Sequence, residues 1–430
     1  MKTEYAYLSK MKSAFTLALL FLFFTSIAQT DSFYLLKPDR VFDGELMHSD
    51  WIVLVKGNKI EACGAMAFKL PANTRVIELP GTTLLPGLIE GHSHLFLHPY
   101  NEVSWNGQVL KESRAERTAR AVEHARATLM AGFTTVRDLG TEGAGYDDAG
   151  LKQAIEKKVV PGPRLIIATR AIVARGAYGP HFSNAEIELP QGAAEVGNQE
   201  EMTNEVRTQI AKGADLVKLY ADYRWGRDGQ AAPTFSVEEM AVATALANSS
   251  GRQTVAHAST KEGMRRAVMA GVSTIEHGDD GDAEIFRLMK EKHVALCPTL
   301  AAGEAILQYN GWRKNADPEP ARITAKKKSF QSALKNEVTI CMGGDVGVFT
   351  HGDNAREMEL MVEYGMKPLE VLKSATSVNA DVFGYGDKIG HIKKGWLADI
   401  IAVKGDPSKT ISDVRNIVLV MKDGKLFVSP

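Results

Sequence analysis

Two histidines separated by one residue are the first feature of this sequence that could do chemistry. The run Gly91-His92-Ser93-His94 follows an apolar stretch that predicts a β-strand. Side chains at positions i and i+2 of a strand point to the same face, about 7 Å apart along the chain. Both imidazoles can therefore bind one metal ion. The pattern alone is weakly specific because the chain has 11 histidines, and its place at a strand end gives it weight.

Three further predicted strands also end in a residue whose side chain can bind a metal ion. They are His257 in Thr254-Val-Ala-His257, His277 in Thr274-Ile-Glu-His277, and Asp345 in Val338-Thr-Ile-Cys-Met-Gly-Gly-Asp345. Imidazole nitrogens and carboxylate oxygens are ligands that zinc accepts. The carboxyl ends of parallel barrel strands meet at one face, where active sites assemble. We therefore predict a metal site built from four histidines and Asp345.

A lysine inside an apolar strand sharpens this prediction. Gly213-Ala-Asp-Leu-Val-Lys218-Leu-Tyr220 places Lys218 where an ammonium group would be buried. Burial is costly for a charge and lowers the pKa of an amine. A neutral amine can react with carbon dioxide to give a carbamate, an anion able to bridge two divalent metal ions. A lysine paired with a nearby carboxylate is the alternative interpretation.

The elements that must position these groups alternate strands with helices. Eight apolar strand candidates lie at 84–95, 134–139, 164–169, 216–221, 254–259, 273–277, 294–300 and 338–345, with amphipathic helical stretches between them. The helix expected at 236–249 opens with Ser236-Val-Glu-Glu239, a capping box. This alternation predicts an α/β fold, a (β/α)₈ barrel. A doubly wound sheet is the competitor, but no glycine-rich phosphate loop follows the first strand.

Both ends of the chain differ from the barrel in pattern. Short apolar runs with turn signals fill residues 31–84 and 385–430, with Gly57-Asn58 and Asp423-Gly424 as expected hairpin turns. We predict one small β-sandwich formed from both termini, flanking a barrel at 85–384.

The first 28 residues predict a signal peptide. Lys10 and Lys12 precede the apolar run 14–24, and small residues follow at Ser26 and Ala28. The run is shorter than the ~20 residues that span a bilayer, so membrane contact is expected only during export, and the mature chain is predicted to be secreted or periplasmic. The net charge of −1 gives no sign of nucleic-acid binding. A homo-oligomer is left open.

Several motifs together resemble the amidohydrolase superfamily over residues 35–425. They are Leu85-Pro-Gly-Leu-Ile-Glu-Gly-His-Ser-His94, Gly132-Phe-Thr-Thr-Val-Arg-Asp138, the Lys218 strand, Glu276-His277-Gly278, Gly344-Asp345 and Gly395-Trp-Leu-Ala-Asp-Ile-Ile-Ala-Val403. The chain is most similar to the imidazolonepropionase-related branch, with its prolidase-like Xaa-Pro and Xaa-Arg/Lys dipeptidases. Two loops depart from that branch, at 176–181 and 220–227, and Gly343-Gly344-Asp345 replaces the usual Gly-Thr-Asp.

The resemblance implies two zinc ions, or similar divalent metals. His92, His94 and Asp345 would bind one ion, His257 and His277 the other, and carboxylated Lys218 would bridge them. The two cations would bring the pKa of a shared water toward neutrality, with Asp345 as general base and then general acid. Tyr220 is a candidate donor to the oxyanion, and His181 is a further candidate catalytic residue.

The implied function is hydrolysis of an amide C–N bond, in dipeptides or N-acyl amino acids. The substrate carboxylate needs a cation, and Arg175, Arg224 and Arg227 are candidates in predicted loops. Two alternatives stay open. One is hydrolysis of a cyclic amide, an imidazolone-like ring or a lactone, and the other is a zinc-binding barrel protein without turnover.

Overall fold

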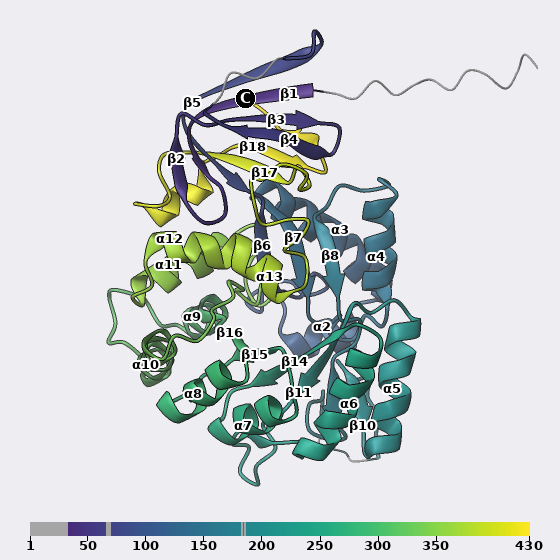
Figure 1. The fold of residues 1–430 in the computed structure, drawn as a ribbon. Helices are drawn as coiled ribbons and strands as arrows, with labels where there is room; N and C mark the ends of the chain where they lie inside the picture. Colours follow the sequence, from purple (N-terminus) through teal and green to yellow (C-terminus); the bar gives the residue numbers. More distant parts are fainter. Residues whose placement is uncertain (1–32, 66–69, 182–183, 185) are drawn as a thin grey trace, which may run out of the picture.

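The computed structural model describes residues 33–65, 70–181, 184 and 186–430. The predicted signal peptide, residues 1–28, lies outside the described residues. Figure 1 shows a β-rich part at one end, made from the two ends of the described chain, above a larger part that alternates strands and helices. Among the residues that the structure describes, no helix has the length and apolar character needed to cross a bilayer.

The β-rich part is one eight-stranded sheet. Its strands are β1 (Phe33–Phe42), β2 (Met47–Ser49), β3 (Ile52–Lys56), β4 (Lys59–Gly64), β5 (Thr74–Pro86), β17 (Ile400–Lys404), β18 (Ile417–Lys422) and β19 (Lys425–Val428). Strand β5 joins the two chain ends, because it pairs with β1 on one side and with β17 on the other. Asp423 and Gly424 both have positive φ angles in the tight turn between β18 and β19, as a type I′ hairpin requires.

Seven parallel strands form most of the barrel. They are β6 (Leu88–Ser93), β7 (Phe133–Asp138), β8 (Arg164–Ile167), β11 (Leu216–Tyr220), β14 (Gln253–Ala258), β15 (Thr274–His277) and β16 (Ala295–Cys297). Two short strands, β9 (Ile172–Ala174) and β10 (Ala194–Val196), extend the sheet beyond β11. Between β8 and β11, the Asp215 amide donates to the Ile167 carbonyl at 2.7 Å.

The predicted eighth strand is not a regular strand. Residues 338–346 run between β16 and β6 and are held on both sides by backbone hydrogen bonds, with isolated bridges at Ile340 and Val346. The backbone leaves the extended conformation at Asp345, which has a φ of 63°. The neighbouring elements also come close at Gly343, where an added Cβ would lie 2.4 Å from Cys297 Sγ and 2.7 Å from His92 N. The segment still closes the gap between the two sheets and carries Asp345 to the rim.

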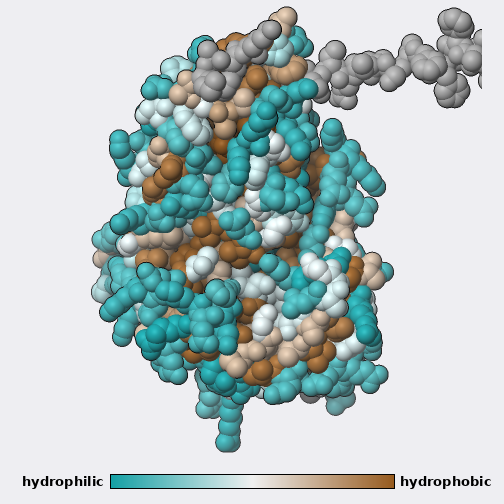
Figure 2. Space-filling model, in the orientation of Figure 1, coloured by the Kyte–Doolittle hydropathy of each residue, from teal (hydrophilic) through white to brown (hydrophobic). Residues whose placement is uncertain are grey.

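Helices cover the outside of the barrel. They include α3 (Arg114–Met130), α4 (Asp147–Glu156), α5 (Gln199–Ala211), α6 (Val237–Ser249), α7 (Lys261–Met269), α8 (Ala283–Glu291), α9 (Leu300–Tyr309), α10 (Ala321–Lys335) and α11 (Ala355–Glu363). Helix α6 begins with the predicted capping box, in which Ser236 and Glu239 each accept from the other's backbone amide. Figure 2 shows hydrophobic residues gathered across the middle of one face, with hydrophilic residues around them.

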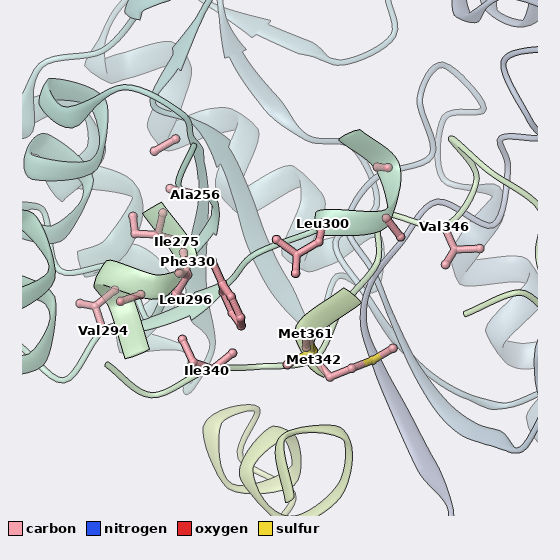
Figure 3. Close-up of a cluster of buried hydrophobic side chains, with 14 of the residues drawn as sticks. Ala256, Ile275, Val294, Leu296, Leu300, Phe330, Ile340, Met342, Val346 and Met361 are labelled. Carbon is pink, nitrogen blue, oxygen red and sulfur yellow. The ribbon is translucent and has the colours of Figure 1, made fainter. Parts of the chain in front are cut away.

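Apolar side chains of strands and helices share one large buried cluster. Figure 3 shows Ile275 and Leu296 of the strands near Phe330 of α10 and Ile340 of the eighth segment. Each of these side chains is at most 5% exposed. Close packing of this kind leaves little freedom to the strand ends, so the polar groups at the rim are carried on rigid elements.

Candidate metal centre

The six residues predicted as metal ligands lie together at the carboxyl-terminal rim of the barrel. His92 lies in β6 and His94 directly after it, Lys218 lies within β11, and His257 and His277 lie at the ends of β14 and β15. Asp345 lies near the end of the eighth segment. Ring centroids are 5.3 Å apart for His92 and His94, 5.1 Å for His92 and His277, and 4.3 Å for His277 and His257. Ligand atoms of His92, His277 and Asp345 all lie within 4.8 Å of one another.

In three of the four histidines, Nδ1 forms a hydrogen bond with a group outside the ligand cluster, and this bond orients the ring. His92 Nδ1 donates to Glu276 Oε2 at 2.9 Å, and His94 Nδ1 donates to the Gly140 carbonyl at 2.8 Å. His277 Nδ1 is hydrogen-bonded to Thr299 Oγ1 at 2.7 Å. Such partners fix the tautomer and the ring direction, as in protein metal sites generally. For His92 and His94, Nε2 is thereby free to face Asp345 Oδ1, at 3.6 and 3.3 Å.

Asp345 and Lys218 each place in the ligand cluster a buried polar atom that lacks a hydrogen-bond partner among the described residues. Lys218 Nζ and Asp345 Oδ1 make no hydrogen bond to any residue that the structure describes. Leaving a buried donor or acceptor unpaired costs about 1–3 kcal/mol. Both atoms belong to the ligand cluster, so bound metal ions would remove this cost. The residues present therefore fit a divalent metal centre.

Burial sets the protonation of the cluster. Loss of hydration lowers the pKa of Lys218 and raises that of Asp345. Burial, and next the neighbouring Lys218 charge, lower the pKa of His92 well below its usual range and that of His257 to about 3. A neutral imidazole is the form that binds a metal ion, so the site is prepared for ligation at neutral pH.

The depressed pKa of His257 predicts how acid affects the metal-free protein. An unfolded histidine titrates near pH 6.5, so between about pH 6.5 and 3 the unfolded chain binds a proton that the folded chain does not. His257 therefore costs stability increasingly as the pH falls through this window. The metal-free His257→Gln variant lacks this cost. Its stability relative to wild type should therefore increase as the pH is lowered from about 7 to 5.

Denaturant unfolding of both metal-free proteins at a series of pH values checks this prediction. Comparing the two proteins cancels the contribution of other buried groups such as Glu357, whose pKa burial raises to about 8. A stability difference that is the same at every pH would contradict it.

Glu276 supports the site and was not among the predicted site residues. Its carboxylate is fully buried, accepts from His92 and pairs with Arg137 Nη2 at 2.8 Å. Arg137 Nε in turn donates to the Gly91 carbonyl at 2.6 Å. The pair links β7 and β15 to the strand of the histidine pair. Arg137 and Glu276 are charged residues within otherwise apolar strands. This was the sequence signal that could have revealed the pair.

Glu276→Gln is expected to weaken metal binding about 10- to 100-fold, because an amide cannot accept from both His92 and Arg137. Metal competition titrations with a chromogenic chelator measure the loss. The exposed Glu291→Gln is the matched control and should bind metal as wild type does. Unchanged affinity in a folded Glu276→Gln protein would contradict the role of Glu276.

Tyr220 and His181 lie in different surroundings. Tyr220 is buried and lines the main cavity, with its ring stacked on His257 at 4.6 Å. Its hydroxyl lies 3.3 Å from the Tyr178 hydroxyl, and its role as an oxyanion donor stays a prediction. His181 is exposed and is not among the residues that line the cavity. The structure therefore does not bring His181 to the metal ligands.

The cavity over the ligand cluster has a volume of about 560 Å³. Of the three arginines proposed from sequence, Arg224 lines it. Arg175 pairs instead with Glu201 at 2.5 Å, and Arg227 is not among the lining residues. Helix α10 adds Arg322, which sequence reasoning missed because it is far along the chain from the predicted loops.

A parallel α/β barrel with a buried histidine-rich cluster at its carboxyl-terminal rim defines the class of barrel metallohydrolases. The model of the amidohydrolase family matches residues 83–427. The chain belongs to the amidohydrolase family, and it is a hydrolase that acts on carbon–nitrogen bonds.

Three relatives place it more closely within the prolidase-like branch. Ochratoxinase of Aspergillus niger is 30% identical over 380 residues, covering 81% of this chain and 76% of the relative. A Xaa-Pro dipeptidase solved with bound methionine in its active site is 32% identical, with a TM-score of 0.81 and coverage of 93% and 100%. A prolidase solved with N-methylphosphonate-L-proline is 25% identical, with the same TM-score and coverage.

Proposed function

We propose that this chain is an exported amidohydrolase with two zinc ions that cleaves the amide bond of dipeptides or N-acyl amino acids. The observation that carries the proposal is the Nζ of Lys218, which is buried in the ligand cluster and has no hydrogen-bond partner among the described residues. A neutral buried amine can take up carbon dioxide, and the resulting carbamate can bridge two metal ions. His92, His94 and Asp345 would then hold one ion, and His257 and His277 the other.

The remaining chemistry belongs to the chain's own groups. When bound, the metal ions would lower the pKa of a water molecule and polarise the substrate carbonyl. In this proposal Asp345 takes up a proton and delivers it to the leaving nitrogen, because an amide leaving group departs only when protonated.

The cavity supports a substrate with an anionic end. Arg224 and Arg322 both line it, from the hairpin after β11 and from α10. A guanidinium group binds a carboxylate with two parallel hydrogen bonds. The likeness to a Xaa-Pro dipeptidase and to a prolidase supports the same choice of substrate, because a dipeptide has an amide next to a carboxylate.

We propose export because the sequence of residues 1–28 has the pattern of a signal peptide. The mature protein would then be secreted or periplasmic. Sequencing the amino terminus of the protein recovered from the periplasm or the medium tests this. A protein that keeps its first 28 residues and stays in the cytoplasm would overturn the proposal of export without affecting that of activity.

A substrate panel tests the activity. Protein prepared with zinc and bicarbonate is assayed against Xaa-Pro and Xaa-Arg/Lys dipeptides, N-acyl amino acids, cyclic amides and lactones, before and after metal removal by a chelator. We expect turnover of dipeptides or N-acyl amino acids that disappears without metal and returns with zinc. Turnover of cyclic substrates alone would refute the substrate class, and no turnover at all would favour a binding protein.

A further inference from the structure

A buried carboxylate stands in the cavity wall beside the metal ligands. Glu142 follows β7 and is 2% exposed. Its Oε2 accepts two hydrogen bonds, from Trp105 Nε1 at 2.9 Å and from the Tyr178 hydroxyl at 2.6 Å. Its Oε1 has only a long contact of 3.5 Å with the Tyr220 hydroxyl. One oxygen of Glu142 is therefore nearly without a donor, although the residue lines the cavity.

The hydrogen-bonding partners of Glu142 are neutral groups. Arg117, whose charge acts on Glu142, directs its guanidinium to the carbonyls of Phe96 and Thr141. Within the described part of the chain, the one basic side chain within 4.0 Å of Glu142 is His94, through its Nδ1. That nitrogen already donates to the Gly140 carbonyl. The carboxylate consequently has no ion pair with a lysine or arginine of the described residues within 4.0 Å, although the Arg117 and Lys218 charges act on it from farther away. A buried carboxylate without a close cation is held only at a cost.

Aromatic rings surround the same place. The ring centroids of Tyr178, Tyr220 and Tyr223 lie 4.7 to 5.8 Å from one another, and all three residues line the cavity. After burial, the charge of Glu142 is the largest cause that raises the pKa of Tyr178 and of Tyr220. These tyrosines stay neutral, and neutral ring faces attract a cation. We call Glu142, Tyr178, Tyr220 and Tyr223 the Glu142 box.

We propose that the Glu142 box binds the free α-ammonium group of the substrate's amino-terminal residue. The proposal rests on the proposed function and narrows it from dipeptides or N-acyl amino acids to substrates with a free amino terminus. In a dipeptide the α-nitrogen lies about 2.5 Å from the carbonyl carbon that is attacked. The ammonium group must then bind next to the metal ligands, and Glu142 Oε1 lies 4.0 Å from His94 Nδ1.

An N-acyl substrate has no positive charge to place in the Glu142 box. Its amide nitrogen is neutral and carries a bulky group, so it would leave Glu142 unbalanced and crowd the tyrosine rings. The box thus distinguishes two substrates that present the same scissile bond and the same carboxylate. Arg224 and Arg322 lie on other elements of the cavity wall and would take the opposite, anionic end of the substrate.

The test compares Glu142→Gln with wild type on a matched pair of substrates. For a Xaa-Pro dipeptide, kcat/KM should fall at least 100-fold in the variant, whereas for the same dipeptide with an acetylated amino terminus it should change less than threefold. Trp105→Phe removes a hydrogen bond but keeps the carboxylate, and it should preserve the preference for the free dipeptide. A merely structural role of Glu142 would lower both activities together and would overturn the proposal.

A binding measurement separates the box from the proposed activity. Calorimetric titration of the zinc-loaded protein with L-methionine and with N-acetyl-L-methionine needs no turnover. Wild type should bind methionine at least tenfold more tightly, and Glu142→Gln should abolish that difference. Equal affinities in wild type would overturn the box, whereas selective binding without hydrolysis of any amide would overturn the proposed function and leave the box in place.

Discussion

Replacing Lys218 by alanine is expected to leave fewer than two metal ions per chain and to remove most of the hydrolytic activity. Lys218 contributes the one nitrogen of the cluster that can become an anionic bridge, and its Nζ has no other partner among the described residues. Loss of an outer partner of a metal ligand already costs about 10- to 100-fold in affinity or activity. Loss of the bridge itself should exceed that, so we expect a fall in kcat of at least about 100-fold.

Metal analysis and steady-state kinetics on the same preparations check this result. Lys328→Ala changes an exposed lysine of α10 and should keep both metal ions and full activity. Lys218→Glu restores a carboxylate at the site and should recover part of the metal content lost in Lys218→Ala. Mass spectrometry of wild type prepared with bicarbonate should show the added mass of one carboxyl group. Two bound metals and normal turnover in Lys218→Ala would refute the bridging role.

The ligand cluster could be predicted from sequence because each ligand occupies an element with a simple pattern. An apolar run ending in histidine or aspartate predicts a buried strand with a polar group at its end, and parallel strands bring those ends together. Lys218 was informative for the same reason, since a lysine flanked by Val217 and Leu219 has no solvent to reach. Local pattern and barrel topology were sufficient to place these residues at one rim.

The residues around the ligands could not be predicted in this way. Glu142 lies in a loop with φ of 49°, and its partners Trp105 and Tyr178 are 37 and 36 residues away. Nothing in the local sequence predicts that these three side chains meet. Arg175 is the opposite case, a residue in a suitable loop that pairs with Glu201 instead of lining the cavity. Loop direction depends on packing across the whole rim, which periodicity does not describe.

At position 344 this chain has glycine where the family motif usually has threonine. The structure reveals a physical reason for the difference. An added Cβ would meet the Phe349 ring at 3.1 Å and Glu357 Cβ at 3.4 Å. Glu357 is itself fully buried and accepts from the amides of Leu300 and Ala301 at the start of α9. The space that a threonine side chain would fill beside Asp345 is thus taken by Phe349 and Glu357. The sequence alone showed the missing hydroxyl but not what replaced it.

Asp345→Asn is expected to lower kcat about 100- to 10,000-fold, the range for loss of a positioned general acid–base group. The amide has nearly the same volume, so packing at the rim should be kept, and its oxygen can still contact a metal ion. It cannot accept the proton that an attacking water must lose, nor return one to the leaving nitrogen. The change therefore separates proton transfer from the shape of the site.

The pH profile decides whether proton transfer is what Asp345 supplies. In wild type, kcat should fall on the acid side as the Asp345 carboxylate becomes protonated and can no longer accept a proton. In Asp345→Asn this acid limb should vanish while the residual rate stays low. Metal analysis must accompany the kinetics, because Asp345 also faces His92 and His94 at 3.6 and 3.3 Å. A variant that keeps both metals, loses activity and loses the acid limb assigns the proton to Asp345. A variant that keeps the acid limb would assign the proton transfer to another group.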